Sequence, residues 1–438
     1  MVRCDLLRLT PLWLLGCVAK PSPSNPVVDT ADSTMVTTEF SVEEIQMLRT
    51  MWPLPDVTAD PTNRYADDPW AIQLGQYLFF DEGLSSTEDV SCATCHDPSQ
   101  GWSDGLKLSE GISEVERHSM QLFNTANNRW FFWDGRCDTQ WCQALQPLED
   151  RTEMGSNRLA VGHYVANDEA LSDAYRQTFG ELPDMSSWPS DGRPVPNEPD
   201  HPDTVAWMTM TPEAQTEANL LFANVGKAIA AFERKIVSRD SAYDRFAETL
   251  LVDGEMTEDH MSASAIRGLQ LFIGDAQCHF CHAGPGFTNR EFANIGLGER
   301  TWLASGDQGR LTGIMSLLEN PFRADGPYSD APESGVEKLA HLSTSGEQQG
   351  QFKVPSLRSV ALTAPFMHGG HFDDLEQVVR HYSEVTEYPE FGHREDLLLD
   401  LHMDDQQIAD VVAFLEALTG APLAETWLSQ PESPLFTP

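Results

Sequence analysis

The sequence predicts a mainly α-helical protein built from two helical domains. Apolar residues recur at spacings of three and four in residues 218–239 and 408–418, the pattern of helices that bury one face. Alternating polar and apolar residues, which would indicate strands, are scarce. A CxxCH motif occurs twice, and a helical pattern precedes each copy, at residues 69–80 and 262–272. Because these two patterns end in the similar runs GQYLFF and GLQLFI, we expect two related domains.

Each CxxCH motif has the residues that attach a c-type haem. Its two thiols can reach the two vinyl groups on one edge of the porphyrin, and the imidazole that follows can reach the iron. A single copy could be a zinc half-site, but two copies without further paired Cys and His ligands favour two covalently bound haems. We therefore expect a cytochrome c-like helical domain around each haem. The predicted attachment residues are Cys92, Cys95 and His96 for the first haem and Cys278, Cys281 and His282 for the second.

The composition changes along the chain and predicts its division into segments. Residues 183–204 and 319–351 are rich in Pro, Gly, Ser and other polar residues, so we expect long surface loops there. The predicted segments are a lipoprotein-type signal peptide at 1–17, a flexible tether at 18–40, the N-terminal haem domain at 41–253, the C-terminal haem domain at 254–422 and a tail at 423–438.

The first 17 residues have the features of an export signal. Arg3 and Arg8 precede an apolar stretch that is too short to span a bilayer as a helix. The stretch ends in Leu-Leu-Gly-Cys17, which resembles the lipobox of bacterial lipoproteins, where the cysteine is acylated. We expect a periplasmic protein whose contact with the membrane is a lipid on Cys17. A plain signal peptide with an incidental cysteine is the alternative.

The chain is strongly acidic. It has 28 Lys and Arg against 68 Asp and Glu, which gives a formal net charge of −40. Such a surface repels nucleic acid and anionic lipid, and it attracts a basic protein partner by electrostatic steering. The charge could also serve solubility alone, because net charge says little about a specific site. We expect no nucleic-acid partner.

Two cysteines, Cys137 and Cys142, lie outside the signal and the haem motifs. In an oxidising compartment they could form a local disulfide. Residues five apart on a continuous helix point to different faces, so the bridge would require an irregular turn. Two free, buried thiols are the alternative.

The sixth ligand of each iron decides what each haem can do. An iron with an open face can bind and split peroxide, whereas an iron capped on both faces can only transfer electrons. Between Asp97 and Arg117 the only His, Met or Lys is Lys107, so we expect the first haem to have an open face. Peroxide cleavage also needs a carboxylate or histidine that moves a proton between the two oxygens. The downstream candidates are Glu149, Asp150 and Glu153.

Four segments form a larger pattern: LFFDEGLSSTEDVSCATCH, RHSMQLFNTANNRWFFWDGR, EMG and FKVPSLRSVALTAPFMHGGHF. Together they resemble the bacterial dihaem cytochrome c peroxidase superfamily, which includes the methylamine-utilisation enzyme MauG. The resemblance covers residues 65–420 except the two predicted loops. FWDGR and VPSLRSVALTAPF are its most specific parts.

The resemblance implies that the N-terminal haem reacts with peroxide and that the C-terminal haem transfers electrons. Trp133, the tryptophan of FWDGR, would lie between the haems and relay electrons; otherwise it would be ordinary core packing. The family's catalytic glutamate follows this tryptophan by twenty residues, which is Glu153. A glutamine at plus ten and a proline at plus fourteen correspond to Gln143 and Pro147. We expect Glu153 to be the general acid–base of O–O cleavage.

The chain departs from typical members of the family after its first CxxCH. Those peroxidases have a histidine in this loop that caps the first haem until the enzyme is half-reduced, and this chain has none. His118 stands where the family usually has an asparagine that helps to bind calcium between the domains. The backbone carbonyls of Thr363 and Pro365 could still contribute to a calcium site.

The resemblance also bears on the sixth ligand of the second haem. Typical peroxidases have a methionine seventeen residues after the proline that corresponds to Pro365, and MauG-like proteins have a tyrosine; here the residue is Tyr382. A phenolate is a hard, anionic ligand that favours oxidised iron, whereas a thioether raises the potential. Alternatively Tyr382 is an ordinary half-buried residue of a helix at 375–383. The rival ligands on chemistry alone are Met367, His371, His381 and Met403.

The expected function is that of a dihaem c-type peroxidase that uses hydrogen peroxide to oxidise an external electron donor, such as a small cytochrome or a cupredoxin. A MauG-like enzyme that modifies side chains of a partner protein is the second interpretation. A non-catalytic dihaem electron-transfer cytochrome is the third, and Glu153 and the uncapped first haem argue against it.

Overall fold

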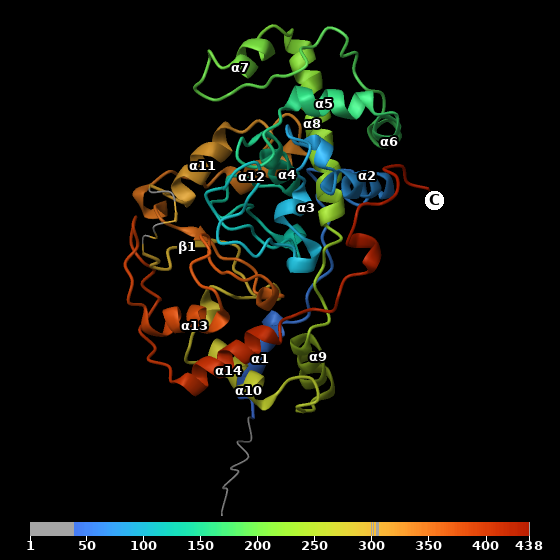
Figure 1. The fold of residues 1–438 in the computed structure, drawn as a ribbon. Helices are drawn as coiled ribbons and strands as arrows, with labels where there is room; N and C mark the ends of the chain where they lie inside the picture. Colours follow the sequence, from blue (N-terminus) through green and yellow to red (C-terminus); the bar gives the residue numbers. More distant parts are fainter. Residues whose placement is uncertain (1–38, 299, 301, 304–305, 438) are drawn as a thin grey trace, which may run out of the picture. The chain divides into compact units, whose positions relative to one another are not determined.

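The computed structural model describes residues 39–298, 300, 302–303 and 306–437, and it is mainly helical, as predicted (Figure 1). The predicted signal peptide, Cys17 and residues 18–38 of the tether lie outside the described residues. Within the part that is described, no helix combines the length and the apolar character needed to cross a membrane.

Most of the helices begin where the sequence offers a capping side chain, although α11 and α12 do not. Thr211, Ser262 and Asp404 each accept a hydrogen bond from a backbone N–H in the first turn of the helix that follows. The two short strands pair antiparallel. The elements are α1 (Val42–Met51), α2 (Pro69–Phe79), α3 (Cys92–Cys95), α4 (Gln140–Glu149), α5 (Arg158–Asn167), α6 (Glu169–Phe179), α7 (Pro202–Trp207), α8 (Pro212–Glu233), α9 (Ala242–Glu248), α10 (Ala263–Ile273), β1 (Phe292–Ala293), α11 (Arg310–Glu319), α12 (Pro332–Leu339), β2 (Phe352–Lys353), α13 (Leu375–Glu384) and α14 (Asp405–Glu416).

The prediction that residues 319–351 form one long loop was wrong, because α12 lies within them. This helix begins at Pro332, whose fixed φ suits the first helical position. It packs through Leu339, which is buried, and through Gly335, where an added Cβ would lie 2.4 Å from the carbonyl carbon of Ala324. The polar composition of the segment concealed this packing. It depends on one apolar side chain, that of Leu339, and on the lack of a side chain at Gly335.

Two helix pairs repeat the same packing. Helix α2 packs on α8, and α10 packs on α14 (Figure 1). Each pair meets at a glycine: an added Cβ would lie 1.8 Å from the carbonyl oxygen of Ala228 at Gly75, and 1.9 Å from that of Asp410 at Gly268. Gly75 begins the GQYLFF run of α2 and Gly268 begins the GLQLFI run of α10. A CxxCH motif follows each of these two helices in the sequence. The sequence similarity therefore reflects two equivalent cytochrome c-like helix pairs.

Each pair belongs to its own hydrophobic core. The first core collects residues of α2, α4, α5, α6 and α8. The second collects residues of α1, α9, α10, α13 and α14. Trp427 and Leu435, near the C-terminus, pack against the first core, and α1 near the N-terminus contributes Leu48 and Met51 to the second. Where one haem domain ends and the next begins stays a prediction.

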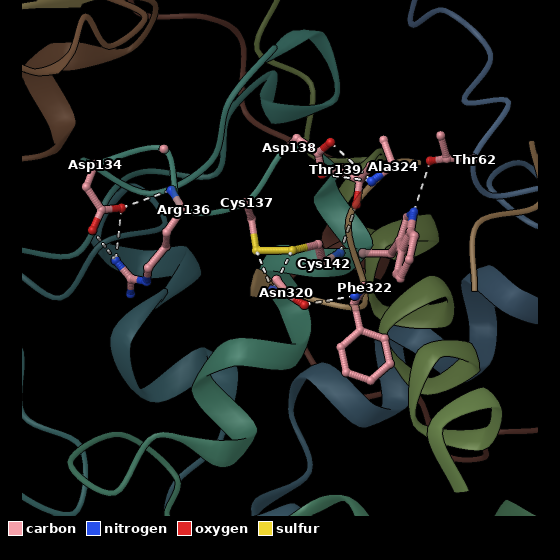
Figure 2. The surroundings of a disulfide bond; sticks show 12 residues. Thr62, Asp134, Arg136, Cys137, Asp138, Thr139, Cys142, Asn320, Phe322 and Ala324 are labelled. Carbon is pink, nitrogen blue, oxygen red and sulfur yellow. Dashed lines mark hydrogen bonds and ion pairs between the residues drawn. A yellow bond between two sulfur atoms is a disulfide. The ribbon is translucent and has the colours of Figure 1, made fainter. Parts of the chain in front are cut away.

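Cys137 and Cys142 form a disulfide, with an S–S distance of 2.11 Å (Figure 2). The irregular turn that the spacing requires is present, because Cys137 precedes α4 and Cys142 lies in its first turn. Thr139 caps this helix by accepting a hydrogen bond from the backbone N–H of Cys142 at 3.1 Å. The Nδ2 atom of Asn320 lies 3.4 Å from the Cys142 sulfur, so the end of α11 contacts the bridge. The disulfide therefore joins the FWDGR loop to the helix that follows it.

Candidate functional site: two cavities that share Trp133

The first CxxCH motif borders a cavity of about 620 Å³. Cys95 and His96 line it, while Cys92 is half-buried at the start of α3 and packs against the first core. The predicted residues of the peroxide site line the same cavity. They are Trp133, Gln143, Pro147 and Glu153.

The second CxxCH motif borders a separate cavity of about 210 Å³. Its lining includes all three motif residues, Cys278, Cys281 and His282, together with Tyr382 of α13. Leucine, valine and phenylalanine side chains of the second core make up much of the remaining wall. An apolar cavity of this kind suits a porphyrin, whose faces are apolar.

Both motifs fit a covalently bound haem. Within the described residues their four cysteines are free thiols. In each motif Nδ1 of the histidine is hydrogen-bonded to a backbone carbonyl, that of Trp102 for His96 at 3.2 Å and that of Phe287 for His282 at 3.0 Å. This bond makes Nδ1 the protonated nitrogen and leaves Nε2 to donate its electron pair to iron. Burial also lowers the pKa of both imidazoles, that of His282 to about 4, so both are neutral, as a ligand must be.

Glu153 has the environment that a proton-transfer group needs. Burial raises the pKa of its carboxyl group to about 7, although the nearby Arg136 acts in the opposite direction. The sequence also offered Glu149 and Asp150 as candidates for the proton-transfer group. Asp150 reaches the same cavity but is exposed, and Glu149 is held by Arg158 through bonds of 2.9 and 2.8 Å away from the cavity lining. Of the three carboxylates, Glu153 is the one that combines burial with a place at the cavity.

Trp133 is one of the residues that line both cavities, together with residues 118–121 and Lys353. Its indole Nε1 donates a hydrogen bond to the carbonyl oxygen of His118 at 2.8 Å, and its own carbonyl oxygen accepts one from the backbone N–H of Lys353 at 2.7 Å. These bonds tie Trp133 to two segments, one that follows the first CxxCH motif and contains His118, and one that follows the second motif and contains Lys353.

Charged side chains fix the FWDGR loop that carries Trp133. Asp134 accepts hydrogen bonds from Arg117 at 2.7 Å and from Arg136 at 3.2 Å (Figure 2 shows the second pair). These two arginines lower the pKa of Asp134 to about 2 against the effect of burial. Arg117 also binds Asp307 at 2.8 Å, so the loop is tied to a distant part of the chain.

The structure narrows the choice of the sixth ligand of the second haem. Tyr382, Met367 and Met403 line the second cavity, whereas His371 and His381 are absent from its lining as described. The His381 ring is hydrogen-bonded instead to the carbonyl oxygen of Ile295 at 3.0 Å. Burial, reinforced by the nearby motif thiols, raises the pKa of the Tyr382 phenol. The assignment of Tyr382 itself stays a prediction.

The predicted calcium residues lie beside the second cavity, since Thr363 and Pro365 line it. His118 is buried, and its Nδ1 is hydrogen-bonded to the carbonyl oxygen of Leu106 at 2.7 Å. Burial lowers the pKa of this imidazole, so it adds no positive charge there. A calcium site stays a prediction.

The sequence did not single out three further residues at the cavities. Glu233 of α8 lines the first cavity, where burial raises the pKa of its carboxyl group to about 8, and Gln140 donates a hydrogen bond to it at 2.8 Å. His368 lines the second cavity and stacks on Phe352, with ring centroids 3.6 Å apart. Lys353 lines both cavities. A sequence signal could have identified Glu233 and Lys353, because each is a charged residue inside an otherwise apolar run, AAFERK and FKVP.

Comparison with known proteins shows which family the chain belongs to. The model of the di-haem cytochrome c peroxidase family matches residues 69–250. The chain is 30% identical to cytochrome-c peroxidase IdrP1 of Denitromonas iodatirespirans over 379 residues, which is 84% of this chain and 85% of that protein. The chain belongs to the dihaem cytochrome c peroxidase/MauG superfamily. Like the other members of this superfamily, it is a peroxide-dependent oxidoreductase with c-type haem cofactors.

Relatives within the superfamily include both of its branches. The chain is 29% identical to the methylamine utilization protein MauG of Methylorubrum extorquens over 395 residues, which is 89% of each protein. Among solved structures, the fold is similar to that of the diheme peroxidase BthA from Burkholderia thailandensis, with a TM-score of 0.59, 21% identity and coverage of 85% of this chain and 91% of that one. It is also similar to a MauG-like protein associated with microbial copper homeostasis, with a TM-score of 0.58, 24% identity and coverage of 87% and 99%.

Proposed function

We propose that this protein is a dihaem peroxidase that cleaves hydrogen peroxide at the haem held by His96 and draws the electrons, through the haem held by His282, from an external protein donor. The observation that supports this division most strongly is the unequal lining of the two cavities. The first has a buried carboxyl group, Glu153, with a pKa near neutrality. The second has Tyr382 and apolar side chains around its histidine.

The protein's own residues would supply proton transfer and positioning. When bound, the first haem supplies a redox-active iron at which the peroxide O–O bond can be cleaved. The Glu153 carboxylate accepts a proton from one peroxide oxygen and returns it to the other, so that water can leave. Gln143 and Pro147 line the same cavity and restrict where peroxide can lie. Trp133 lines both cavities and provides the aromatic connection through which electrons pass between the haems.

The donor would be a small cytochrome or cupredoxin with a basic docking surface. The net charge of −40 favours such a partner through electrostatic steering. We further propose that the protein is exported to the periplasm and is anchored there through a lipid on Cys17.

A second candidate function is the oxidation of side chains in a partner protein, as the name of the MauG relatives suggests for methylamine utilisation. The observation that favours it is Tyr382 at the second cavity. An anionic phenolate on the second iron would favour its oxidised state, which suits the withdrawal of electrons from a distant substrate.

The pH dependence of peroxide turnover should report the ionisation of Glu153. Only its carboxylate form can accept a proton from peroxide, and its pKa is raised to about 7. We therefore expect kcat/KM for peroxide to fall as the pH drops through about 7, by about tenfold per pH unit well below the pKa. A limb centred near the pKa of an exposed carboxylate, about 4.3, would contradict the assignment.

Replacing Tyr382 with phenylalanine should change the spectrum of the second haem alone. Loss of the phenolate removes an anionic ligand, so the potential of that haem should rise and its low-spin absorption should change, while the first haem still responds to peroxide. Absorption and electron paramagnetic resonance spectra of the purified variant measure this. The matched control is Tyr388→Phe, because Tyr388 is 84% exposed and should leave both spectra unaltered. An unaltered spectrum in Tyr382→Phe would favour Met367 or Met403.

The proposed function is tested with the purified protein, once mass spectrometry has shown two attached haems. Peroxide is added with a reduced, basic c-type cytochrome or with a reduced cupredoxin, and donor oxidation is followed by absorption. We expect peroxide-dependent oxidation of a donor and a high-spin first haem that responds to peroxide. Two low-spin haems that are inert to peroxide would overturn the proposal. Modified side chains in a co-purified partner, with no donor oxidation, would favour the second function.

A further inference from the structure

Lys353 is a buried cation at the junction of the two cavities. It ends β2, only 5% of its surface is exposed, and it lines both the first and the second cavity. Within the described residues, its ammonium group has no hydrogen-bond or ion-pair partner. Burial without a compensating charge lowers its pKa to about 8.

Other buried cations of the chain have a partner in the protein. Arg358 and Lys227 bind Asp244 and Asp330 at 2.9 and 2.8 Å. Arg310 donates to the carbonyl oxygen of Gly135 at 2.8 Å. A buried charge without such a partner destabilises the folded state. Lys353 therefore differs from these residues in a way that calls for an anion from outside the chain.

The anionic side chains at the first cavity do not meet this need. Asp134 is bound by Arg117 and Arg136, and Asp307 is bound by Arg117. Glu233 accepts its hydrogen bond from Gln140. Glu153 has Arg136 as its nearby cation. Within the described part of the chain, no carboxylate lies within ion-pair distance of the Lys353 ammonium group.

The backbone of Lys353 is held in place. Its N–H donates to the carbonyl oxygen of Trp133 at 2.7 Å, and the β1–β2 pairing aligns it with Phe292. The next residue, Val354, donates its N–H to the carbonyl oxygen of Glu291 at 2.9 Å. The backbone that carries the ammonium group is therefore fixed beside Trp133, another residue that lines both cavities.

We propose that Lys353 binds a propionate carboxylate of haem where the two cavities meet. Its positive charge would then lie beside Trp133 and would raise the midpoint potential of that haem. Haem brings two carboxylates into each cavity, and a carboxylate is the partner that an ammonium group lacks here. This inference rests on the proposed function, because it assumes that both cavities hold haem. Since Lys353 lines both cavities, the carboxylate could belong to either haem, and the potentials of the two haems distinguish these cases.

The test is Lys353→Met in the protein with both haems attached, compared with the unaltered protein by spectroelectrochemical titration. Removing a positive charge beside a haem disfavours its reduced form, so we expect the midpoint potential of the haem that Lys353 contacts to fall. Lys353→Arg keeps the charge and should keep the potential close to that of the unaltered protein. The matched control is Lys107→Met, because Lys107 is exposed, pairs with Asp373 and lies outside both cavity linings as described.

Two attached haems with both potentials unchanged in Lys353→Met would overturn the inference while leaving the proposed function intact. A protein that carries no haem at all would instead refute the proposed function. If Lys353→Met does not fold, Lys353→Arg decides the matter through resonance Raman spectroscopy. The longer guanidinium should shift the propionate bending band of one haem, and unchanged bands of both haems would contradict the proposed contact.

Discussion

Replacing Glu153 with glutamine should slow peroxide turnover by about 10²–10⁴-fold, the range that a positioned acid–base group contributes. The amide has nearly the same shape as the carboxyl group but cannot accept or return a proton. Glu153 is the buried carboxyl group among the residues first considered, and its pKa of about 7 suits proton transfer in both directions at neutral pH. Stopped-flow measurement of the reaction with peroxide gives the rate directly.

The neighbouring acid gives the matched control. Asp150 lines the same cavity but is exposed, so Asp150→Asn should change the rate only slightly. The negative charge of Asp150 contributes to the raised pKa of Glu153, and its removal should therefore move the pH limb of the reaction slightly downward. If Asp150→Asn proves to be the slow variant and Glu153→Gln turns over normally, the acid–base assignment is wrong.

Replacing Arg358 with methionine should lower the free energy of unfolding by about 3–5 kcal/mol, the usual cost of breaking a buried ion pair from one side. The Arg358 side chain is fully buried, and its guanidinium donates to both oxygens of Asp244 at 2.9 and 3.0 Å. Its Nε also donates to the carbonyl oxygen of Pro285 at 2.6 Å. The substitution leaves the Asp244 carboxylate without its cation and this carbonyl without its donor.

Guanidinium denaturation followed by circular dichroism measures this loss. The control is Arg245→Met, which removes a pair with Asp240 whose side chains are 43% and 64% exposed. Such an exposed pair should contribute less than about 1 kcal/mol. Equal effects of the two substitutions would show that burial does not strengthen the Arg358–Asp244 pair. Because residues 355–357 and 360 line the second cavity, Arg358→Met should also disturb the spectrum of the second haem.

The sequence by itself determined the features that depend on short-range pattern. A CxxCH motif needs only five residues to place two thiols and an imidazole together. The apolar periodicity of a helix likewise depends only on residues three and four apart, which share one helix face. For this reason α10 and α14 lie within a few residues of their predicted ranges. The choice between a Cys137–Cys142 disulfide and two free thiols was also local. The turn before α4 decided it, because this turn brings the two sulfur atoms together.

Only the tertiary structure decided which of several chemically similar residues face each cavity. Glu149 and Glu153 are four residues apart, yet Arg158 holds the first while the second lines the cavity beside His96. His381 and Tyr382 are adjacent, yet only Tyr382 lines the second cavity. Segments far away along the chain decide how deeply a side chain is buried and which hydrogen-bond or ion-pair partner it finds. They also decide whether it lacks such a partner, as Lys353 does within the described residues. The two motifs were therefore predictable from sequence, whereas the difference between their surroundings was not, because distant segments must pack before a side chain has a cavity to face.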